Sequence, residues 1–141
     1  MSAPRLEIDL AKVGHNARVL VERLGARGIS VTGVTKAALG LPALATTLLD
    51  AGVSALGDSR IENLEGLRAA GITAPTMLIR SSMISQASRV VASADVSCNT
   101  EVAVLTALTD RTWFYDARRK NMHVRVKVKA GEDCIINLNF E

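Results

Sequence analysis

The sequence predicts an α/β fold built from parallel βα units. Short apolar segments rich in β-branched residues alternate with amphipathic segments of helical period, and the linkers between them are short. The segment at 29–36 is apolar enough to be buried on both faces, as strands of parallel sheets are. Two arrangements satisfy this pattern: a doubly wound open sheet, and a (β/α)8 barrel or part of one. No strand is followed by GxGxxG or GxxxxGK[ST], which disfavours a nucleotide-binding sheet and favours the barrel.

The expected elements alternate regularly through most of the chain. Strands are expected at 6–10, 29–36, 53–59, 75–81 and 95–99, and helices at 11–28, 41–52, 61–71, 84–94 and 100–110. In the first helix, Val13, Ala17 and Leu20 recur at helical spacing and Gly25 ends the pattern. A further segment, 123–130, alternates strictly between apolar and polar residues, which predicts a strand with one face in water.

Composition predicts one folded, cytoplasmic domain. The chain has 141 residues, of which 48% are hydrophobic and 22% charged, so it is able to bury a core. No apolar run approaches the roughly 18 residues that a membrane span needs, and the amino terminus lacks a basic and then apolar signal segment. Cys98 and Cys134 lack CxxC or Cys/His spacing, so neither a disulfide framework nor a metal site is predicted. We expect Cys98 to be a buried, small apolar residue.

Charge and aromatic content change sharply along the chain. Residues 1–110 contain ten basic and ten acidic side chains, whereas residues 111–141 contain seven basic and four acidic ones and all of the aromatic residues. We therefore predict two regions: 1–110, which holds the βα units, and 111–141, a divergent basic segment that ends in a strand. Interleaved basic and aromatic residues at 111–129 are compatible with nucleic-acid binding. A solvated edge strand whose lysines block aggregation explains them better, so no nucleic-acid partner is expected.

Lys36 stands at the carboxyl end of the strand expected at 29–36. Ligands of parallel sheets and of barrels bind at the carboxyl ends of the strands, so this amine is a candidate reactive group. A partly dry strand end suits an amine that forms a Schiff base. The alternative is a lysine whose aliphatic chain leads its charge out to solvent. Position alone favours the solvated lysine.

Polar residues also follow the next three strands. In the turn GDSRIEN, either Asp58 or Ser59 caps the next helix while Arg60 pairs with a carboxylate, or the turn forms a polar cradle for a ligand. Arg80, at the next strand end, is expected either to bind an anionic group or to pair with an acid. Asn99 follows the strand after that. These positions converge on one edge of the predicted sheet.

Two stretches resemble a known family. RLEIDLAKVGHNARVL, followed by VTGVTKAALGLPALATTLLDAGVSALGDSRIENLEGLRAAGITAPTMLIR, is similar to the amino-terminal half of PLP-dependent amino-acid racemases of the alanine racemase barrel superfamily, and most similar to the alanine/ornithine racemase branch. The resemblance covers roughly residues 5 to 109 and depends mainly on VTK together with DSRIEN. It implies a partial (truncated) TIM-like PLP-binding barrel, of which residues 1–110 form the N-terminal part.

By this resemblance Lys36 is the catalytic residue, which holds pyridoxal 5′-phosphate (PLP) as an internal aldimine and moves the α-proton of a free amino acid. The implied activity is that of an amino-acid racemase, an isomerase. The DSRIEN turn lies near the cofactor in the family, and the later strand ends come next. The implied cofactor-binding residues are therefore Lys36, Asp58, Ser59, Arg60, Asn63, Arg80 and Asn99. Related enzymes dimerise, which makes a homodimer an option.

The chain also departs from the family pattern. In alanine racemases the lysine motif continues with a tyrosine and a glycine, whereas here Leu39 stands in that neighbourhood and only Gly40 remains. The segment VRVKVKAGEDCIINLNFE differs from the further βα units that supply the phosphate cup, the pyridine-nitrogen contacts and the second acid/base group. Barrel strands are expected near residues 30, 54, 76, 96 and 124. We therefore expect a truncated racemase chain, and inactivity is one consequence of the truncation.

Two alternatives to an active racemase stay open. One is a non-catalytic protein that holds PLP through Lys36 without turnover, similar to single-domain PLP homeostasis proteins with the same barrel. The other is a non-functional fragment of a racemase. Both predict the same fold and the same lysine, and they differ from the enzyme in turnover alone or in cofactor binding as well.

Overall fold

The computed structural model describes residues 6–112, 122–127 and 133–138. Its main sheet has four parallel strands, which lie in chain order: β1 (Thr32–Val34), β2 (Ala55–Asp58), β3 (Thr76–Leu78) and β4 (Val96–Ser97). In a doubly wound sheet the strand order reverses at a switch point, and this order does not reverse. The sheet therefore has the arrangement of part of a (β/α)8 barrel.

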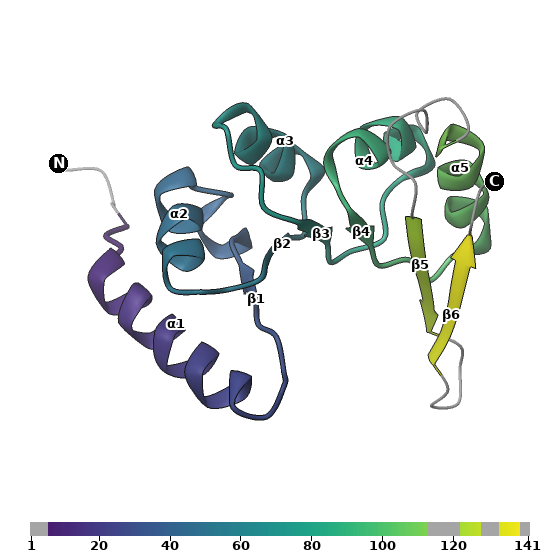
Figure 1. Ribbon diagram of the computed structural model, residues 1–141. Helices are drawn as coiled ribbons and strands as arrows, with labels where there is room; N and C mark the ends of the chain where they lie inside the picture. The colour runs from purple at the N-terminus through teal and green to yellow at the C-terminus, as the bar shows by residue number, and fades with distance from the viewer. Residues whose placement is uncertain (1–5, 113–121, 128–132, 139–141) are drawn as a thin grey trace, which may run out of the picture.

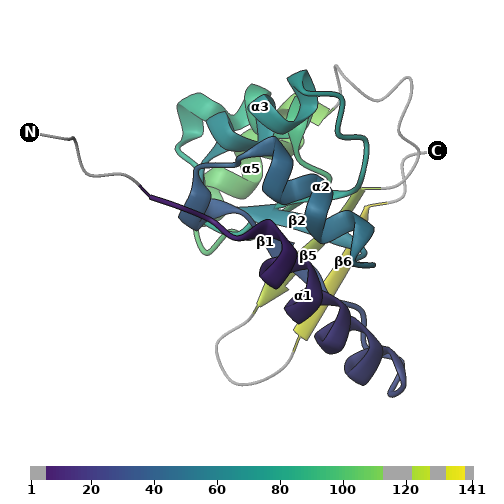
Figure 2. The ribbon, with the colours of Figure 1, turned by 90° about the vertical axis from the view of Figure 1, so that its left-hand side faces the viewer.

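A helical segment follows each strand of this sheet (Figure 1). The helical segments are α1 (Leu10–Gly25), η1 (Lys36–Ala38), α2 (Pro42–Asp50), α3 (Ile61–Ala69), η2 (Ile84–Gln86), α4 (Ala87–Ser93) and α5 (Val102–Thr112). Figure 1 shows α2 to α5 in chain order over the strands, and Figure 2 shows α1 next to α2. The regular alternation of strands and helices expected from the sequence is confirmed, although the observed strands are shorter than the expected ones.

The hydrophobic core lies between the sheet and these helices. Leu56 of β2 and Leu64 and Leu67 of α3 have no exposed surface, and Leu78 of β3 is only 2% exposed. Burying such a side chain stabilises the fold by about 2 kcal/mol relative to leaving it in water. Gly33 of β1 lets α2 pack closely on this face, because an added Cβ would lie 3.0 Å from Cδ1 of Leu48.

The opposite face of the sheet lines the interior in a complete barrel. Gly57 of β2 lies there, and an added Cβ would be 3.2 Å from Ile79, 3.5 Å from Thr32 and 3.6 Å from Val34. Val34 remains 45% exposed, so this face is only partly covered by the described residues. The carboxyl edge of the sheet, where Lys36 follows β1, borders the same face.

The expected strand at 6–10 is wrong, because this segment leads directly into α1 instead. Asp9 is the N-cap of α1, with extended backbone angles, and its Oδ1 accepts a hydrogen bond from the backbone N–H of Lys12 at 3.1 Å. That hydrogen bond lowers the pKa of the Asp9 carboxyl. An aspartate three residues before its donor is a helix-start signal, and it overrides the short alternation of LEIDL.

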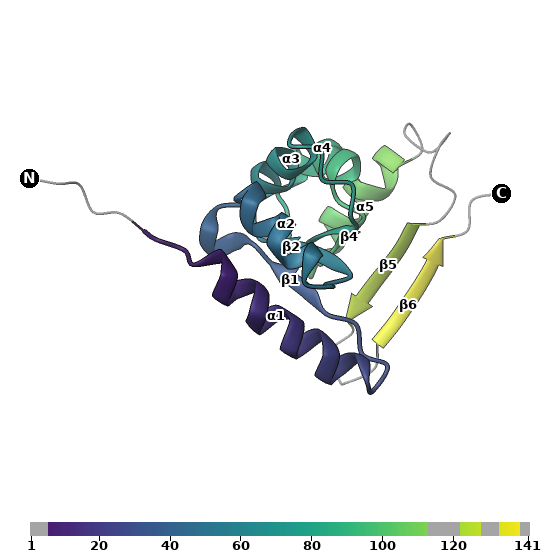
Figure 3. The ribbon, with the colours of Figure 1, turned by 60° about the vertical axis from the view of Figure 1, so that its left-hand side comes forward.

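The expected fifth barrel strand near residue 124 is also wrong. The strand exists as β5 (Met122–Lys127), but it pairs antiparallel with β6 (Asp133–Leu138) in a separate two-stranded sheet. Figures 1 and 3 show this hairpin beside β4 and α5. Only five residues separate the two strands, and a hairpin needs far less connecting chain than a parallel crossover does. β5 therefore pairs with its near neighbour β6 and not with β4.

Arg68 of α3 joins the amino ends of β3 and β4. Its guanidinium donates hydrogen bonds to the carbonyl oxygens of Ile72 (3.0 Å) and Ala74 (2.9 Å), to Oγ1 of Thr76 (3.0 Å) and to Oδ2 of Asp95 (2.6 Å). The same Asp95 oxygen accepts the backbone N–H of Thr76 at 2.8 Å. This network lies at the end of the sheet opposite to Lys36, which gives it a structural role.

Arg89 of α4 clamps α3 from the surface. It bonds both carboxylate oxygens of Glu65, at 2.8 and 2.6 Å, and also lies 2.9 Å from Oε1 of Glu62. The hydrogen bond from Arg89 lowers the pKa of Glu65 from its ordinary value of 4.5. The Arg89 and Glu65 side chains are 41% and 35% exposed, so solvent screens the pair and its contribution to stability is small.

Replacing Arg89 with methionine should therefore cost little stability and should change its pH dependence. Because the folded-state pKa of Glu65 is lowered, the pair stabilises the fold above pH 4.5, and this contribution is lost as the pH falls through the lowered folded-state value. Urea unfolding of wild type and variant, at neutral pH and well below pH 4.5, measures this difference. A gap between the two proteins that persists at acid pH would contradict the assignment.

Three further expectations concern the burial of Cys98, metal binding and membrane-spanning helices. The expectation that Cys98 is buried is wrong: it is exposed, directly after β4. Among the described residues, no group of three His, Cys, Asp or Glu side chains is placed to hold a metal ion. The helices in the described part of the chain are all too short or too polar to cross a membrane. The strand and basic segment proposed for residues 111–141 fall partly outside the described residues.

Candidate functional site

The turn that presents Lys36, called the Lys36 turn below, covers residues 35–40 and begins where β1 ends. Thr35 continues the sheet, because its backbone N–H donates to the carbonyl oxygen of Gly57 at 2.9 Å. Its own carbonyl oxygen accepts the N–H groups of Ala38 (3.0 Å) and Gly40 (3.3 Å), which closes the turn. Lys36 is the first residue of that turn and is exposed. The turn thus holds an accessible primary amine at the carboxyl edge of the sheet.

Two residues with positive φ end the turn and dock it on α3. Leu39 has φ 52° and Gly40 has φ 69°, and the left-handed region costs a residue with a side chain roughly 1–2 kcal/mol. At Gly40 a side chain is excluded for a second reason. An added Cβ would lie 2.8 Å from Cβ of Asn63 and 3.2 Å from its Cα and carbonyl oxygen. The Lys36 turn therefore packs directly against the first turn of α3.

Asp58, the last residue of β2, joins the Lys36 turn to α3. Its side chain has no exposed surface. Oδ2 accepts the hydroxyl of Thr35 at 2.8 Å, and Oδ1 accepts the backbone N–H of Arg60 at 3.0 Å and Nδ2 of Asn63 at 2.9 Å. All three partners are donors, which is what an ionised carboxylate accepts. In the described part of the chain Asp58 forms no ion pair, so these hydrogen bonds are what compensates its burial.

The sequence singled out Asp58, Arg60 and Asn63, and the structure brings these three together with one residue that the sequence analysis missed. Thr35 is completely buried and bonds Asp58 directly. A signal for it was present, because a threonine stands immediately before the lysine in VTK. Its partner is 23 residues away, so the contact depends on the parallel register of β1 and β2.

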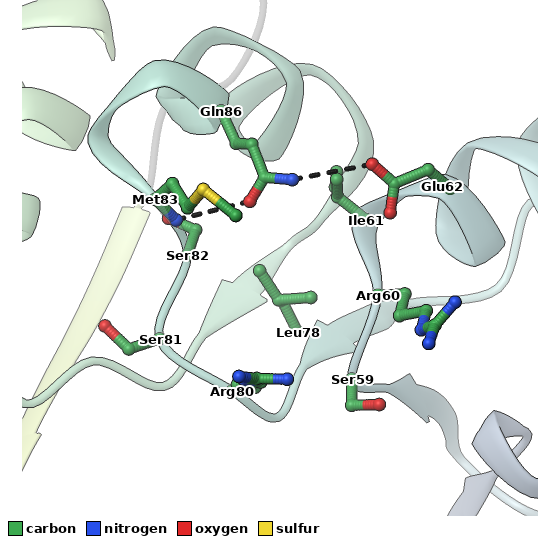
Figure 4. Close-up of a pocket in the computed structure, with 10 residues that line it drawn as sticks. All are labelled: Ser59, Arg60, Ile61, Glu62, Leu78, Arg80, Ser81, Ser82, Met83 and Gln86. Atoms are coloured by element: carbon green, nitrogen blue, oxygen red, sulfur yellow. Dashed lines mark hydrogen bonds between the residues drawn. The ribbon is translucent and has the colours of Figure 1, made fainter.

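The other predicted residues lie around a second feature, a cavity of about 330 Å³ between the turns after β2 and β3 (Figure 4). Ser59, Arg60 and Arg80 line it, together with Ile61, Glu62, Leu78, Ser81, Ser82, Met83 and Gln86. Gln86 bridges its rim, since Nε2 donates to Oε1 of Glu62 at 3.4 Å and Oε1 accepts the N–H of Met83 at 3.2 Å. Lys36 does not line this cavity.

Asn99 lies next to the cavity and is 9% exposed. Its Oδ1 accepts the hydroxyl of Ser81 at 3.4 Å, and its Nδ2 donates to Oγ of Ser97 at 3.0 Å. The neighbouring Ser82 hydroxyl is buried and has no hydrogen-bond partner among the described residues. The predicted site residues thus fall into two groups along one edge of the sheet, the Lys36 turn with Asp58 and Asn63, and the cavity with Ser59, Arg60 and Arg80.

Comparison with known families agrees with this architecture. The family model for the alanine racemase N-terminal domain matches residues 8–132. A curated lysine racemase from Thermotoga maritima is 48% identical over 86 residues, which are 61% of this chain and 24% of the relative. An alanine racemase from Mycobacterium ulcerans is 41% identical over 73 residues, 50% of this chain and 18% of the relative. The chain thus spans about a quarter or less of the length of these relatives.

Solved structures share the fold at low sequence identity. D-threonine aldolase from Filomicrobium marinum superposes with a TM-score of 0.74 and 16% identity, over 94% of this chain and 36% of that one. An alanine racemase from D-cycloserine producing Streptomyces lavendulae gives a TM-score of 0.68 and 24% identity, over 94% and 35% of the two chains. The predicted family and fold class are confirmed: the chain belongs to the alanine racemase N-terminal domain family and has the parallel α/β architecture of part of its barrel.

Proposed function

We propose that this chain binds PLP covalently through Lys36 and contributes the cofactor-binding part of an amino-acid racemase. The observation that supports this most directly is the Lys36 turn. It places an exposed primary amine at the carboxyl edge of a parallel sheet, on a backbone fixed by Thr35 and Gly40. Family membership, and a lysine racemase among the relatives, support the reaction class.

The residues present fit the chemistry of the cofactor. An aldehyde needs an accessible amine, and the Lys36 side chain is exposed and has no carboxylate partner in the described part of the chain. A phosphate needs cations and donors. Ser59, Arg60 and Arg80 offer these at the same edge, and neither arginine has an acidic partner among the described residues.

This assignment divides the predicted cofactor contacts. Lys36 is proposed as the covalent attachment point, and Ser59, Arg60 and Arg80 as the groups that face the phosphate. The side chain of Asp58 is engaged with both Thr35 and Asn63, so we assign Asp58 and Asn63 to the support of the turn. Asn99 is held by Ser81 and Ser97 and is proposed as a support of the cavity wall.

In the proposed reaction, Lys36 transfers the proton at the α-carbon of a free amino acid. When bound, the cofactor withdraws electrons from the α-carbon and so makes its proton acidic. The Nζ atom of Lys36 would take or return that proton on one face of the α-carbon. Racemisation requires a second proton-transfer group on the other face. In the described part of this edge of the sheet, Asp58 is held by three donors and Glu62 by Arg89 and Gln86, whereas Lys36 and the thiol of Cys98 are exposed.

The antiparallel pairing of β5 with β6, where a fifth barrel strand was expected beside β4, favours a second candidate function, in which the chain holds PLP without turnover. Both functions depend on Lys36, and they differ in whether a second acid/base group reaches the substrate. A chiral assay of amino-acid enantiomers, run on protein that has been shown to bind the cofactor, separates them. Interconversion of enantiomers supports the racemase, and bound cofactor without interconversion supports the non-catalytic carrier.

The first test is covalent capture of the cofactor. Wild-type protein mixed with PLP should gain a visible absorbance band, which borohydride should convert into a stable adduct on Lys36, located by mass spectrometry of the peptides. Lys36→Ala should lose the adduct. Lys12→Ala removes another exposed lysine, on α1, and should keep it. An adduct that forms equally in Lys36→Ala, or that is distributed over several lysines, would contradict the proposal.

A further inference from the structure

We infer that Thr35 and Asp58 are positioning residues for Lys36: the buried Asp58 carboxylate fixes Thr35, and Thr35 fixes the turn that presents the amine. This inference deepens the proposed function and rests on it for its meaning in catalysis. Its structural half, the control of the Lys36 turn by the Asp58 carboxylate, concerns contacts within the chain alone.

Asp58 itself is anchored on two sides. The carboxylate bonds two groups of the α3 turn, the N–H of Arg60 and Nδ2 of Asn63, through the same oxygen, Oδ1. Its backbone carbonyl also accepts the N–H of Ile79 at 2.9 Å, which ties it to β3. Asp58 is thus held by α3 on one side and by the sheet on another, and its second oxygen is left in a fixed position.

The Asp58 carboxylate in turn fixes the side chain of Thr35. The other carboxylate oxygen, Oδ2, lies 2.8 Å from the Thr35 hydroxyl. The carbonyl oxygen of Gly57, the second possible acceptor, lies 3.3 Å from the same hydroxyl. A hydroxyl has one proton, and a hydrogen bond to a charged acceptor is the stronger choice. Threonine is also stiff at χ1. Because Thr35 is completely buried, no water competes for this contact.

The backbone of Thr35 in turn fixes the turn that carries the Lys36 amine. The Thr35 carbonyl accepts the N–H groups of Ala38 and Gly40, so both ends of the Lys36 turn close on this one residue. Gly40 then packs on Asn63, which is itself bonded to Asp58. Asp58, Thr35, Gly40 and Asn63 thus form a closed chain of contacts at the base of the turn that carries Lys36. A disturbance of the Thr35 hydroxyl should therefore change the position of the amine.

The chain contains a matched pair at the opposite end of the sheet. Thr76 is also a buried threonine, 1% exposed, whose hydroxyl donates to the carbonyl oxygen of Ser93 at 2.8 Å and lies 3.2 Å from Oδ2 of Asp95. Thr35→Val and Thr76→Val thus make the same chemical change, at the carboxyl and at the amino end of the sheet. General destabilisation affects both variants, whereas loss of lysine positioning affects only the first.

The experiment measures the turn and the amine separately. Amide hydrogen exchange of Ala38 and Gly40, followed by NMR without cofactor, should accelerate about tenfold in Thr35→Val, which is the factor expected for one lost hydrogen bond, and stay at the wild-type rate in Thr76→Val. With PLP added, Thr35→Val should form the Lys36 adduct about tenfold more slowly and lose the circular dichroism that a fixed lysine imposes on the bound cofactor. Thr35→Ser keeps the hydroxyl and should recover both.

Asp58→Ala tests the same contact from the other side and keeps the test decisive if Thr35→Val does not fold. It should reproduce the fast exchange and the slow adduct formation, and Asp58→Asn, which keeps an oxygen for the α3 donors, should restore them in part. Wild-type exchange and adduct rates in folded Thr35→Val or Asp58→Ala overturn the inference, as does an equal slowing in Thr76→Val. Fast exchange in Thr35→Val, combined with no adduct in any protein including wild type, supports the positioning of the turn and overturns the proposed function instead.

Discussion

Replacing Arg68 with methionine is expected to lower the free energy of unfolding by about 2 to 3 kcal/mol. Methionine keeps much of the aliphatic length but removes every donor. The carbonyl oxygens of Ile72 and Ala74 then lose a partner, and Asp95 loses its cation at 2.6 Å while it stays two-thirds buried. The effect is below that of a completely buried ion pair, because the Arg68 side chain is 24% exposed.

Arg89→Met is the matched control for this prediction. It is the same substitution, one helix further along, and it also removes the contact of an arginine with a carboxylate, but from a pair that is open to solvent. Urea unfolding of the three proteins should give a clearly lower midpoint for Arg68→Met, with an unchanged slope, and a small shift for Arg89→Met. Equal shifts would mean that burial does not set the strength of these two networks. Adduct formation at Lys36 should survive in folded Arg68→Met, because the network lies at the other end of the sheet.

Local sequence patterns predicted most of the secondary structure. The expected strands at 29–36, 53–59 and 75–81 each contain the observed strand, and each expected helix overlaps an observed one. The pattern failed where a single side chain decided the outcome. In LEIDL the alternation of apolar and polar residues indicates a strand, but the Asp9 carboxylate caps the following helix and stops the segment from pairing.

Contacts between distant segments were harder to predict. The strand at 123–130 was expected from its alternation, yet its partner was not, because periodicity describes one strand and pairing depends on what else is within reach. The same reason hid Thr35. A threonine before a lysine has no distinguishing local pattern, and its importance comes from a carboxylate 23 residues away that the parallel register of β1 and β2 brings to 2.8 Å.

The candidate site shows what a strand-end rule can and cannot predict. The rule that ligands bind at the carboxyl edge correctly brought Lys36, Asp58 and Arg80 to one edge of the sheet. It does not say which way each side chain faces. Asp58 is one residue beyond Gly57 in β2, and successive residues in a strand face opposite sides, so Asp58 turns into the helix layer and supports the site from behind. Burial, which requires the three-dimensional structure, therefore separates supporting residues from candidate contacts.

Gly40→Ala is expected to cost about 3 kcal/mol and to impair the Lys36 site. Two effects combine. The backbone has φ 69°, which disfavours alanine, and the new methyl group would lie 2.8 Å from Cβ of Asn63 and 3.2 Å from its backbone atoms. Backbone atoms of a helix cannot rotate away, so the turn must lift off α3. The Gly40 N–H would then lose the Thr35 carbonyl oxygen, and the lysine would move with the turn.

Gly71→Ala separates the two effects, because Gly71 has φ 84° and an added Cβ there has no heavy atom within 4 Å. It should cost about 1 kcal/mol from the backbone angle alone and leave adduct formation at Lys36 unchanged. Gly40→Ala should unfold at a clearly lower urea concentration and form the adduct at least tenfold more slowly, since a displacement of about 1 Å is enough to slow a positioned group a hundredfold. If both glycine variants lost the same stability and both kept the wild-type rate, the contact between the turn and Asn63 would not position the lysine. The Thr35 hydroxyl and the backbone of β1 would then be the supports that remain.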